Sequence, residues 1–222
     1  MTNEERQRLY EQYKEQQAQA EQAMIERHQL ELLIRKRAAE TQNILDTQPR
    51  QQYAAIVAVD LLGGFSAAGK IPWHYPADFK WFQARTKGHI CVMGRVTYDD
   101  INQRLGDKAA ESVLPGRKCF VVTSTPLPRE NATAVASIGA IDKLLTEEDI
   151  TRTVFFIGGE SIYREGIAKC NAVYVTVVNK DAECDRFFPT EYLMKHFDVE
   201  KTLTHPSDNE LSFMVWKRKT GT

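Results

Sequence analysis

The order of hydrophobic and polar positions divides this 222-residue chain into two parts. From residue 53 onward, short runs rich in β-branched and aromatic residues alternate with polar segments of helical composition. The strand-like runs lie at 53–61, 89–94, 118–124, 132–137, 153–159, 172–178 and 210–218, and the helical segments at 77–86, 95–104, 140–145 and 160–169. Runs that are apolar on both faces and alternate with helices predict a mostly parallel sheet covered on both sides.

The last two of these runs follow one another without a clear helix between them, which predicts an antiparallel edge of the sheet. Residues 53–222 are therefore expected to form one α/β domain. At about 170 residues, such a domain is long enough to bury its own core.

Residues 1–46 have a different pattern and predict one long helix. Glu, Gln, Ala, Leu, Arg and Lys dominate, and residues 47–52 form a polar linker in which Pro49 stops the helix. A 4-3 spacing of weakly apolar positions leaves open a coiled coil, a solvated helix, a helix docked on another protein, or partial disorder. Self-association or docking is the favoured interpretation, because a charged helix with a faint apolar stripe rarely stays ordered alone. The spaced positions are Leu9, Tyr13, Gln16, Ala20, Ala23, Arg27, Leu30 and Ile34.

Composition supports the same division and excludes several classes of protein. All 12 glycines follow residue 52, so the turns of a packed domain belong to the second part. A net charge of −1 argues against a nucleic-acid partner. No apolar run reaches the length of a membrane span, and the charged N-terminus lacks a secretion signal, so a cytoplasmic protein is expected. The four cysteines have irregular spacing, which favours reduced core thiols over a disulfide or metal site.

Two strand-to-helix junctions carry candidate chemistry, because α/β sheets bind ligands beyond the carboxyl ends of their strands. In FFIGGESIY, Gly158 and Gly159 let backbone N–H groups approach an anion at a helix start; a tight turn is the competing interpretation. In GGFSAAGKIPWHYPADFKWF, Asp78 falls in the first turn of a helix beside aromatic residues. It is either a capping carboxylate or, if it faces an apolar cleft, an acid with a raised pKa that anchors a ligand.

At this point the residues resemble those of the dihydrofolate reductase family. IVAVDLLGGFSAAGKIPWHYPADFKWF is followed in order by VMGRVTY, LPGRK, FFIGGESIY, YVT and D-x-FFP, and the resemblance covers residues 54–218. It implies an eight-stranded, mostly parallel sheet with an antiparallel C-terminal edge, flanked by helices. It also implies hydride transfer from the cofactor NADPH to C6 of dihydrofolate, with protonation at N5.

The resemblance assigns the pterin pocket residue by residue. Asp78 matches the single acid that would bind the pterin 2-amino group and N3, Thr176 the hydroxyl that braces it, and Trp73 the tryptophan beside it. The glutamate α-carboxylate would pair with Arg117, whose planar fork fits such an anion. The remaining contacts to the substrate would come from Ile56, Phe79, Phe82, Ile101, Leu114 and Ile157.

For the cofactor, the resemblance implies a cis peptide between Gly158 and Gly159, and a 2′-phosphate site at Arg95 and Ser124 that favours NADPH over NADH. A mobile lid over the nicotinamide matches the loop from Leu62 to Ile71. The other cofactor contacts implied are Ala58, Ser66, Gly94, Val96, Thr97, Glu160, Ser161, Ile162 and Tyr163.

Two departures from the family pattern stand out. The stretch between Ile101 and Leu114 is longer than the usual link, which would reshape the rim of the folate pocket, and Asp100 stands where a small polar residue is common. A riboflavin-pathway reductase on the same fold is the competing enzyme, but it gives no reason for Asp78 and Arg117. A scaffolding protein that carries a reductase-like domain on an assembly helix is the alternative of a different class.

Overall fold

The computed structural model describes residues 7, 8, 14, 22, 24–40, 51–205 and 208–220. The chain divides into two units, Met1–Pro49 and Arg50–Thr222. In the first unit, residues 24–40 are helical and every one of them is exposed, including Leu30, Leu33 and Ile34. Of the 4-3 positions, only Arg27, Leu30 and Ile34 fall within the described residues. The coiled-coil interpretation therefore stays a prediction.

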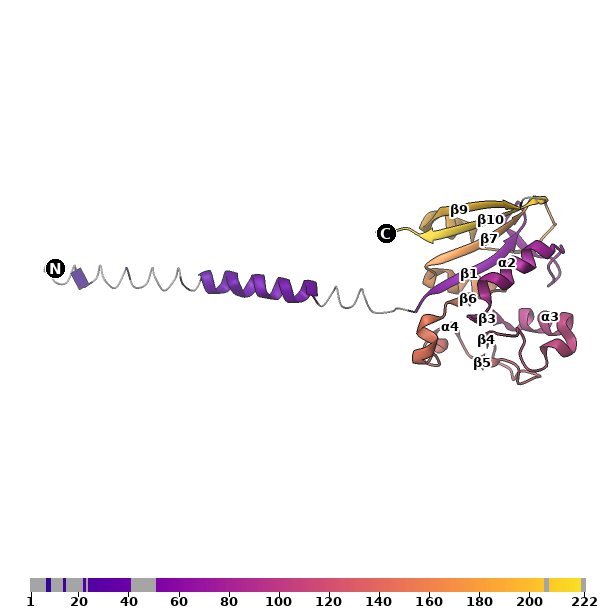
Figure 1. Cartoon of the computed structure of the whole chain (residues 1–222), viewed down its shortest axis with the longest axis horizontal. Coiled ribbons are helices and arrows are strands. Elements are labelled where there is room, and N and C mark those ends of the chain that lie inside the picture. The colour runs from indigo at the N-terminus through magenta and orange to yellow at the C-terminus, as the bar shows by residue number, and fades with distance from the viewer. Residues whose placement is uncertain are drawn as a thin grey trace. The chain divides into compact units, whose positions relative to one another are not determined.

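The second unit is built on an eight-stranded sheet with strand order β5-β4-β3-β6-β1-β7-β10-β9. All neighbouring strands from β5 to β7 pair in parallel, whereas β10 is antiparallel to both β7 and β9. Figure 1 shows β9 and β10 at one edge of this sheet and β5 at the other. The strands are β1 (Tyr53–Val59), β3 (Ile90–Gly94), β4 (Lys118–Val122), β5 (Thr133–Val135), β6 (Val154–Phe156), β7 (Ala172–Val178), β9 (Phe197–His205) and β10 (Asp208–Arg218).

Helices and a small second sheet complete the domain. Strands β2 and β8 pair with each other outside the main sheet. The helices are α2 (Pro76–Thr86), α3 (Arg95–Leu105), α4 (Ile138–Ile141), α5 (Glu160–Gly166) and α6 (Thr190–His196), with 3-10 turns η1 (Gly106–Ala109), η2 (Glu147–Thr151) and η3 (Ile167–Lys169); the small strands are β2 (Gly64–Ser66) and β8 (Arg186–Phe187).

The structure confirms the mostly parallel sheet and corrects what lies before its last strand. The segment between 172–178 and 210–218 contains helix α6 and strand β9, which the hydrophobic pattern did not indicate. Strand β9 alternates polar and apolar residues at the edge of the sheet, and α6 has only seven residues, so neither produces a continuous apolar run. Strand β10 is antiparallel as expected, but its edge-side neighbour is β9.

Two other helices differ in extent from the prediction. The segment expected at 140–145 forms the earlier and shorter helix α4. The segment expected at 160–169 is α-helical only to Gly166 and continues as the 3-10 turn η3. A Cβ at Gly166 would lie 2.6–2.9 Å from the ring of Phe156. Glycine therefore lets α5 approach the sheet closely enough to cover it.

The core lies on both faces of the sheet because consecutive strand residues point to opposite sides. Ala55 and Val57 of β1 belong to the cluster that contains Phe156, whereas Ala54 and Ile56 belong to the cluster that contains Phe155. Because buried side chains cover both faces, a ligand site is expected at the carboxyl ends of the strands.

The four cysteines are free. Cys91, Cys119 and Cys170 are buried as expected, whereas Cys184 is only half-buried and so is not a core thiol. Burial raises the pKa of Cys119 to about 12, and burial likewise raises that of Cys170 to about 12. No helix within the described residues is both long and apolar enough to cross a membrane.

Candidate active site

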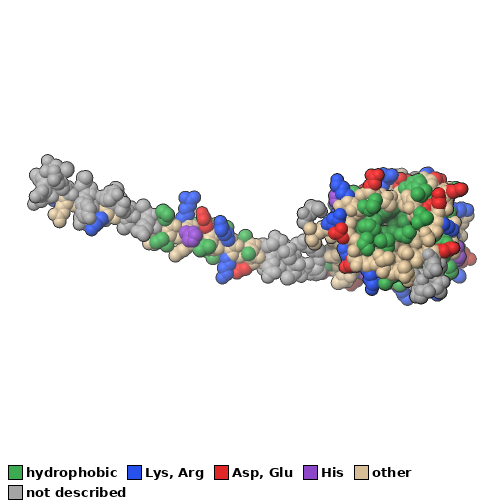
Figure 2. All heavy atoms as spheres, turned by 90° about the horizontal axis from the view of Figure 1, so that it is seen from above, with side chains coloured by type: hydrophobic (Ala, Val, Ile, Leu, Met, Phe, Trp, Pro, Cys, Tyr) green, Lys and Arg blue, Asp and Glu red, His purple; other side chains and the backbone are tan. Residues whose placement is uncertain are grey.

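A cavity of about 950 Å³ lies at the carboxyl ends of β1, β3 and β6, between helices α2, α3 and α5. Its size is within the range of small-molecule and cofactor sites. On the face of the domain seen in Figure 2, hydrophobic side chains gather in a hollow and charged side chains stand around it. The lining of the cavity combines apolar side chains, such as Ile56 and Leu114, with charged ones, such as Asp78 and Arg117.

Most of the residues assigned by the resemblance meet in this cavity. It is lined by the substrate set Ile56, Asp78, Phe79, Phe82, Ile101, Leu114, Arg117 and Ile157, and by the cofactor set Ala58, Ser66, Gly94, Arg95, Val96, Thr97, Gly158, Gly159, Glu160, Ser161 and Tyr163. The other four assigned residues, Trp73, Ser124, Ile162 and Thr176, do not line it.

Asp78 occupies one end of the cavity, in the first turn of α2. Pro76 starts this helix, where its missing N–H is not needed, and this places Asp78 in the first turn. The carboxyl is hydrogen-bonded to the hydroxyl of Thr176 on β7, a residue that is 1% exposed. Burial raises the pKa of Asp78 above its usual range, and the Thr176 hydrogen bond opposes this only in part. A partly desolvated carboxyl is a strong candidate for binding a hydrogen-bond donor or a cation.

The aromatic ring of Tyr163 is a buried part of the cavity wall. This residue comes from α5, and its hydroxyl donates a 2.9 Å hydrogen bond to the carbonyl of Ile56 on β1. The ring also packs edge-on against Phe65 of β2, with ring centroids 5.3 Å apart. Tyr163 therefore ties α5, β1 and the small sheet together, and burial and the nearby Asp78 charge raise its pKa.

Glycines form the opposite end, where backbone replaces side chains. The N–H of Gly94 donates a 2.8 Å hydrogen bond to the carbonyl of Gly158, which joins the ends of β3 and β6. The Gly158–Gly159 peptide is cis, as the resemblance implies, and Gly158 has φ +109°. A Cβ at Gly158 would come within 3.2–3.3 Å of the Tyr163 ring. The positive φ and the nearby ring favour glycine there, and residues of the first turn of α3 (Arg95, Val96 and Thr97) line the cavity beside it.

Charged side chains surround this glycine end. Arg95 pairs through Nε with both carboxylate oxygens of Asp99, at 3.0 and 2.9 Å, and donates to the Thr125 hydroxyl at 2.9 Å. Glu160 is paired with Arg164 at 2.9 Å and lies 3.9 Å from the Nε of Arg186. Arg95 and Arg186 line the cavity here, so this end can offer guanidinium groups to a phosphate-bearing ligand.

The segment from Leu62 to Ile71 borders the cavity and is held at its base by two acids. The Oδ1 atom of the buried Asp60 accepts the N–H groups of Leu62 and Gly64, at 2.9 and 2.8 Å. Asp185 accepts the N–H of Ala68 at 3.1 Å and donates its own N–H to Ser66 at 2.9 Å. The tip of the segment, with Gly69 and Lys70, is exposed. These bonds hold the segment from Leu62 to Ala68, and its exposed tip is closed by backbone hydrogen bonds between Ala67 and Lys70, at 2.9 and 3.0 Å.

Arg117 lies at the rim with its guanidinium held in place. Its Nε donates to the hydroxyl of the buried Thr86 at 2.8 Å, and its Nη1 donates to the carbonyl of Pro115 at 2.9 Å. Lys87 lines the same part of the cavity. A guanidinium fixed by neutral partners keeps its charge available for a ligand anion.

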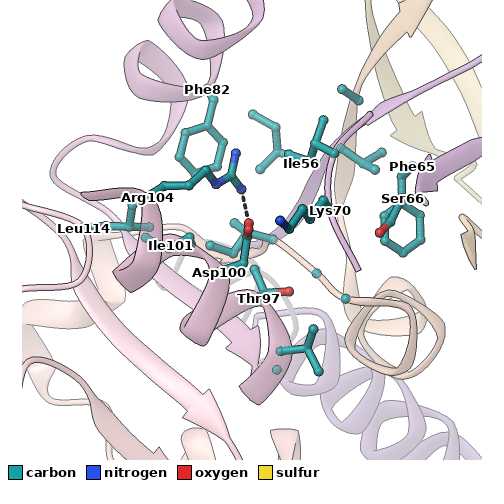
Figure 3. Close-up of a pocket in the computed structure, with 18 of the residues that line it drawn as sticks. Ile56, Phe65, Ser66, Lys70, Phe82, Thr97, Asp100, Ile101, Arg104 and Leu114 are labelled. Carbon is teal, nitrogen blue, oxygen red and sulfur yellow. Dashed lines mark hydrogen bonds and ion pairs between the residues drawn. The ribbon is translucent and has the colours of Figure 1, made fainter. Parts of the chain in front are cut away.

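The long link after Ile101 supplies side chains that the resemblance did not assign. Helix α3 continues to Leu105 and the turn η1 follows, which brings Arg104 and Lys108 to the cavity wall. Figure 3 shows Arg104 paired with Asp100 inside the cavity. The sequence signalled the longer link but not the direction of these side chains. Phe65 and Lys70 belong to the expected lid, whereas other lining residues, among them His74, Lys87 and Arg186, were missed from the sequence.

A mostly parallel sheet with a glycine-edged, arginine-bearing cavity at its carboxyl ends defines a nucleotide-binding α/β protein. The family model described as dihydrofolate reductase matches residues 52–218. The chain belongs to the dihydrofolate reductase family.

Individual relatives agree with this assignment. The chain is 33% identical over 144 residues to a type 3 dihydrofolate reductase of Salmonella typhimurium, covering 64% of this chain and 81% of that protein. It is 30% identical over 169 residues to a type 9 dihydrofolate reductase of Escherichia coli, covering 72% and 90%. A solved dihydrofolate reductase from Enterococcus faecalis, complexed with NADP(H) and RAB-propyl, superposes with a TM-score of 0.63 at 28% identity, covering 76% of this chain and 96% of that one.

Proposed function

We propose that this chain reduces 7,8-dihydrofolate to 5,6,7,8-tetrahydrofolate with NADPH, by hydride transfer to C6 and protonation at N5. The observation that carries the proposal is the half-buried carboxyl of Asp78, which faces the same cavity as the glycine end. One end presents an acid suited to a pterin ring, and the other presents backbone and arginine suited to a dinucleotide.

On the substrate side, Asp78 binds the 2-amino group and N3 of the pterin through its two oxygens, while Thr176 holds the carboxyl in position. A negative charge at this point raises the basicity of N5, and water delivers the proton. The carbonyls of Ile56 and Ile157 face the 4-position of the ring. Side chains of Phe79, Phe82, Ile101 and Leu114 enclose the ring systems, and Arg117 takes the glutamate α-carboxylate.

On the cofactor side, the cavity fits NADPH because the glycine end leaves backbone room and Arg95 supplies charge. When bound, NADPH supplies the hydride from its nicotinamide ring. Gly158 and Gly159 make room for the pyrophosphate, and Arg95 with Ser124 pairs with the 2′-phosphate, although Ser124 lies outside the cavity lining. Ala58 and Ser66 border the nicotinamide, and the remaining contacts come from Gly94, Val96, Thr97, Glu160, Ser161, Ile162 and Tyr163.

The segment from Leu62 to Ile71 closes over the reacting rings and excludes water, which strengthens the electrostatic effect of Asp78. Trp73 supports this closure from behind the wall. It is 8% exposed and packs in the cluster with Val178, Leu211 and Phe213. Its indole N–H is buried and has no hydrogen-bond acceptor within the described part of the chain.

The direct test is the loss of NADPH absorbance with dihydrofolate as substrate. Wild type is expected to turn over, and Asp78→Asn, which keeps the shape but removes the charge, is expected to lower kcat about 10²–10⁴-fold at neutral pH. Wild type without turnover would refute the function. Asp78→Asn with full activity would leave the function standing and refute the role of the carboxyl.

We further propose that residues 1–46 form a helix that mediates self-association or docking, that 47–52 is a linker, and that the reductase part works in the cytoplasm. Support comes from residues 24–40, where Ile25, Leu32 and Leu33 are exposed on a helix. Light scattering should give a larger mass than one chain for full-length protein and a single-chain mass for a chain beginning at Gln51. Equal single-chain masses would exclude self-association and leave docking.

A further inference from the structure

The long link after Ile101 places an ion pair inside the cavity. Asp100 and Arg104 are four residues apart on α3, so they share one face of the helix. Both line the cavity, and their side chains are paired, with the aspartate 17% and the arginine 42% exposed. In Figure 3 the guanidinium of Arg104 meets Asp100 in the part of the cavity that Phe82 and Ile101 also line.

This part of the cavity carries more positive charge than one carboxylate requires. Four of the cationic side chains that line the cavity come from α2–α3 and the link that follows, namely Lys87, Arg104, Lys108 and Arg117. The tail of dihydrofolate is a glutamate, which has two carboxylates. Arg117 is fixed by Thr86 and Pro115 and suits one of them. The second carboxylate requires a partner that can reach it.

Arg104 differs from Arg117 in how it is held. Within the described residues its side chain hydrogen-bonds only to Asp100. Partly exposed pairs at this spacing are weak, because water competes and long side chains lose freedom. A bidentate bond between a guanidinium and a ligand carboxylate is stronger than such a pair. The cost of releasing Arg104 from Asp100 is therefore small compared with the gain from binding a ligand anion.

On the basis of the function proposed above, we propose that Arg104 is a specificity residue that binds the second, γ-carboxylate of the substrate's glutamate tail. In the free protein Asp100 holds the guanidinium inside the cavity. The substrate carboxylate then replaces Asp100 as its partner, and Lys108, four residues further on, adds positive charge beyond it. Recognition of the tail is thus divided between a fixed arginine and a releasable one.

The test compares two substrates and three variants. Dihydrofolate is compared with its analogue in which glutamine replaces the glutamate tail, because this analogue keeps the α-carboxylate and loses the γ-charge. Arg104→Gln is expected to raise KM for dihydrofolate about tenfold, the effect of losing a bond between charged groups, with kcat unchanged. Arg104→Lys keeps the positive charge but loses the bidentate guanidinium, so it should raise KM for dihydrofolate less than Arg104→Gln does. Neither change should alter KM for the glutamine analogue.

The double variant Asp100→Asn/Arg104→Gln separates binding from simple neutralisation. If Arg104 binds the tail, KM for dihydrofolate stays raised in the double variant. If Arg104 only neutralises Asp100, KM returns to the wild-type value and the proposal is overturned. Arg27→Gln is the matched control. It removes the arginine of an exposed pair at the same spacing, Arg27 with Glu31, and should leave KM for both substrates unchanged.

Two further outcomes would overturn the proposal. One is a wild-type enzyme with equal KM for dihydrofolate and the glutamine analogue, and the other is an Arg104→Gln effect of equal size on both substrates. KM for NADPH and the thermal unfolding midpoint of each variant report whether the fold is intact. Failure of the proposed function looks different, because wild type would then oxidise NADPH with neither substrate.

Discussion

The two ends of the cavity are built in different ways. The centre of the cofactor end is backbone, because Gly94 and Gly158 are joined directly by a 2.8 Å hydrogen bond, and side chains such as Arg95 lie around it. The substrate rim consists of long cationic side chains, of which Arg117 is fixed and Arg104 is held by one weak pair. A backbone site tolerates almost no substitution, whereas a rim of side chains can be reshaped by a change in loop length. The insertion before Leu114 falls at the tolerant end.

The largest effect is expected at the backbone end, from Gly158→Ala. Its φ of +109° strains any side chain, and the new Cβ would push the Tyr163 ring, whose hydroxyl binds Ile56. Together these should cost about 2–4 kcal/mol of unfolding free energy. Binding of NADPH, followed by its fluorescence, should weaken at the same time.

Gly88→Ala is the matched control for that change. Gly88 also has a positive φ, +80°, but its Cβ would meet nothing within 4 Å, and it does not line the cavity. It should lose some stability from the strained φ and keep its affinity for NADPH. Equal losses of NADPH affinity in both variants would show that the contact with Tyr163 is irrelevant.

A smaller effect is expected at the rim, from Arg117→Gln. Loss of a charge-assisted bond should raise KM for dihydrofolate roughly 10–100-fold, because such bonds contribute about 1.5–3 kcal/mol. NADPH affinity should stay the same, since Arg117 lies at the substrate end. A loss of NADPH affinity as large as the rise in KM would mean that the two ends are not independent.

The lid should respond less strongly. Asp185→Asn weakens the bond from Ala68 but leaves the backbone bond from Asp185 to Ser66. Loss of one exposed hydrogen bond costs about 1 kcal/mol, so kcat should fall about fivefold. Asp181→Asn is the control. Asp181 is an exposed acid in the same segment between β7 and β8 as Asp185, but it accepts a hydrogen bond from Glu183 of that segment, so this change should leave kcat unchanged.

The smallest effect concerns stability at Asp78. Its pKa is raised in the folded state, mainly by burial, so the folded protein holds this proton more tightly than the unfolded chain. The protonated carboxyl therefore contributes stability to the fold in acid, and this contribution is lost as pH rises through the folded pKa. Asp78→Asn should accordingly raise the unfolding midpoint more at pH 7 than at pH 3. An equal shift at both values would contradict the raised pKa.

The cofactor end could be predicted from the sequence because a buried strand, two glycines and a helix start are local signals, as in FFIGGESIY. The apolar strands of the parallel sheet were predictable for the same reason. Strand β9 was not, since its alternating residues resemble a polar loop. The direction of the Arg104 side chain could not be predicted either, because it depends on where α3 ends. Gly106 ends the helix with φ +55°.

Because the main sheet buries three of the thiols, the rate at which they react can report how often the sheet opens. Cys91 and Cys119 sit opposite each other on β3 and β4, and Cys170 lies buried after η3, all with raised pKa values that suppress the thiolate. A thiol reagent can modify these three only while the sheet is open, whereas Cys184, beside Gly64, is half-buried and partly accessible in the folded protein, although burial raises its pKa too, to about 11. The rate at which each thiol reacts, with and without NADPH, would measure how far cofactor binding slows the opening of the strands that form its site.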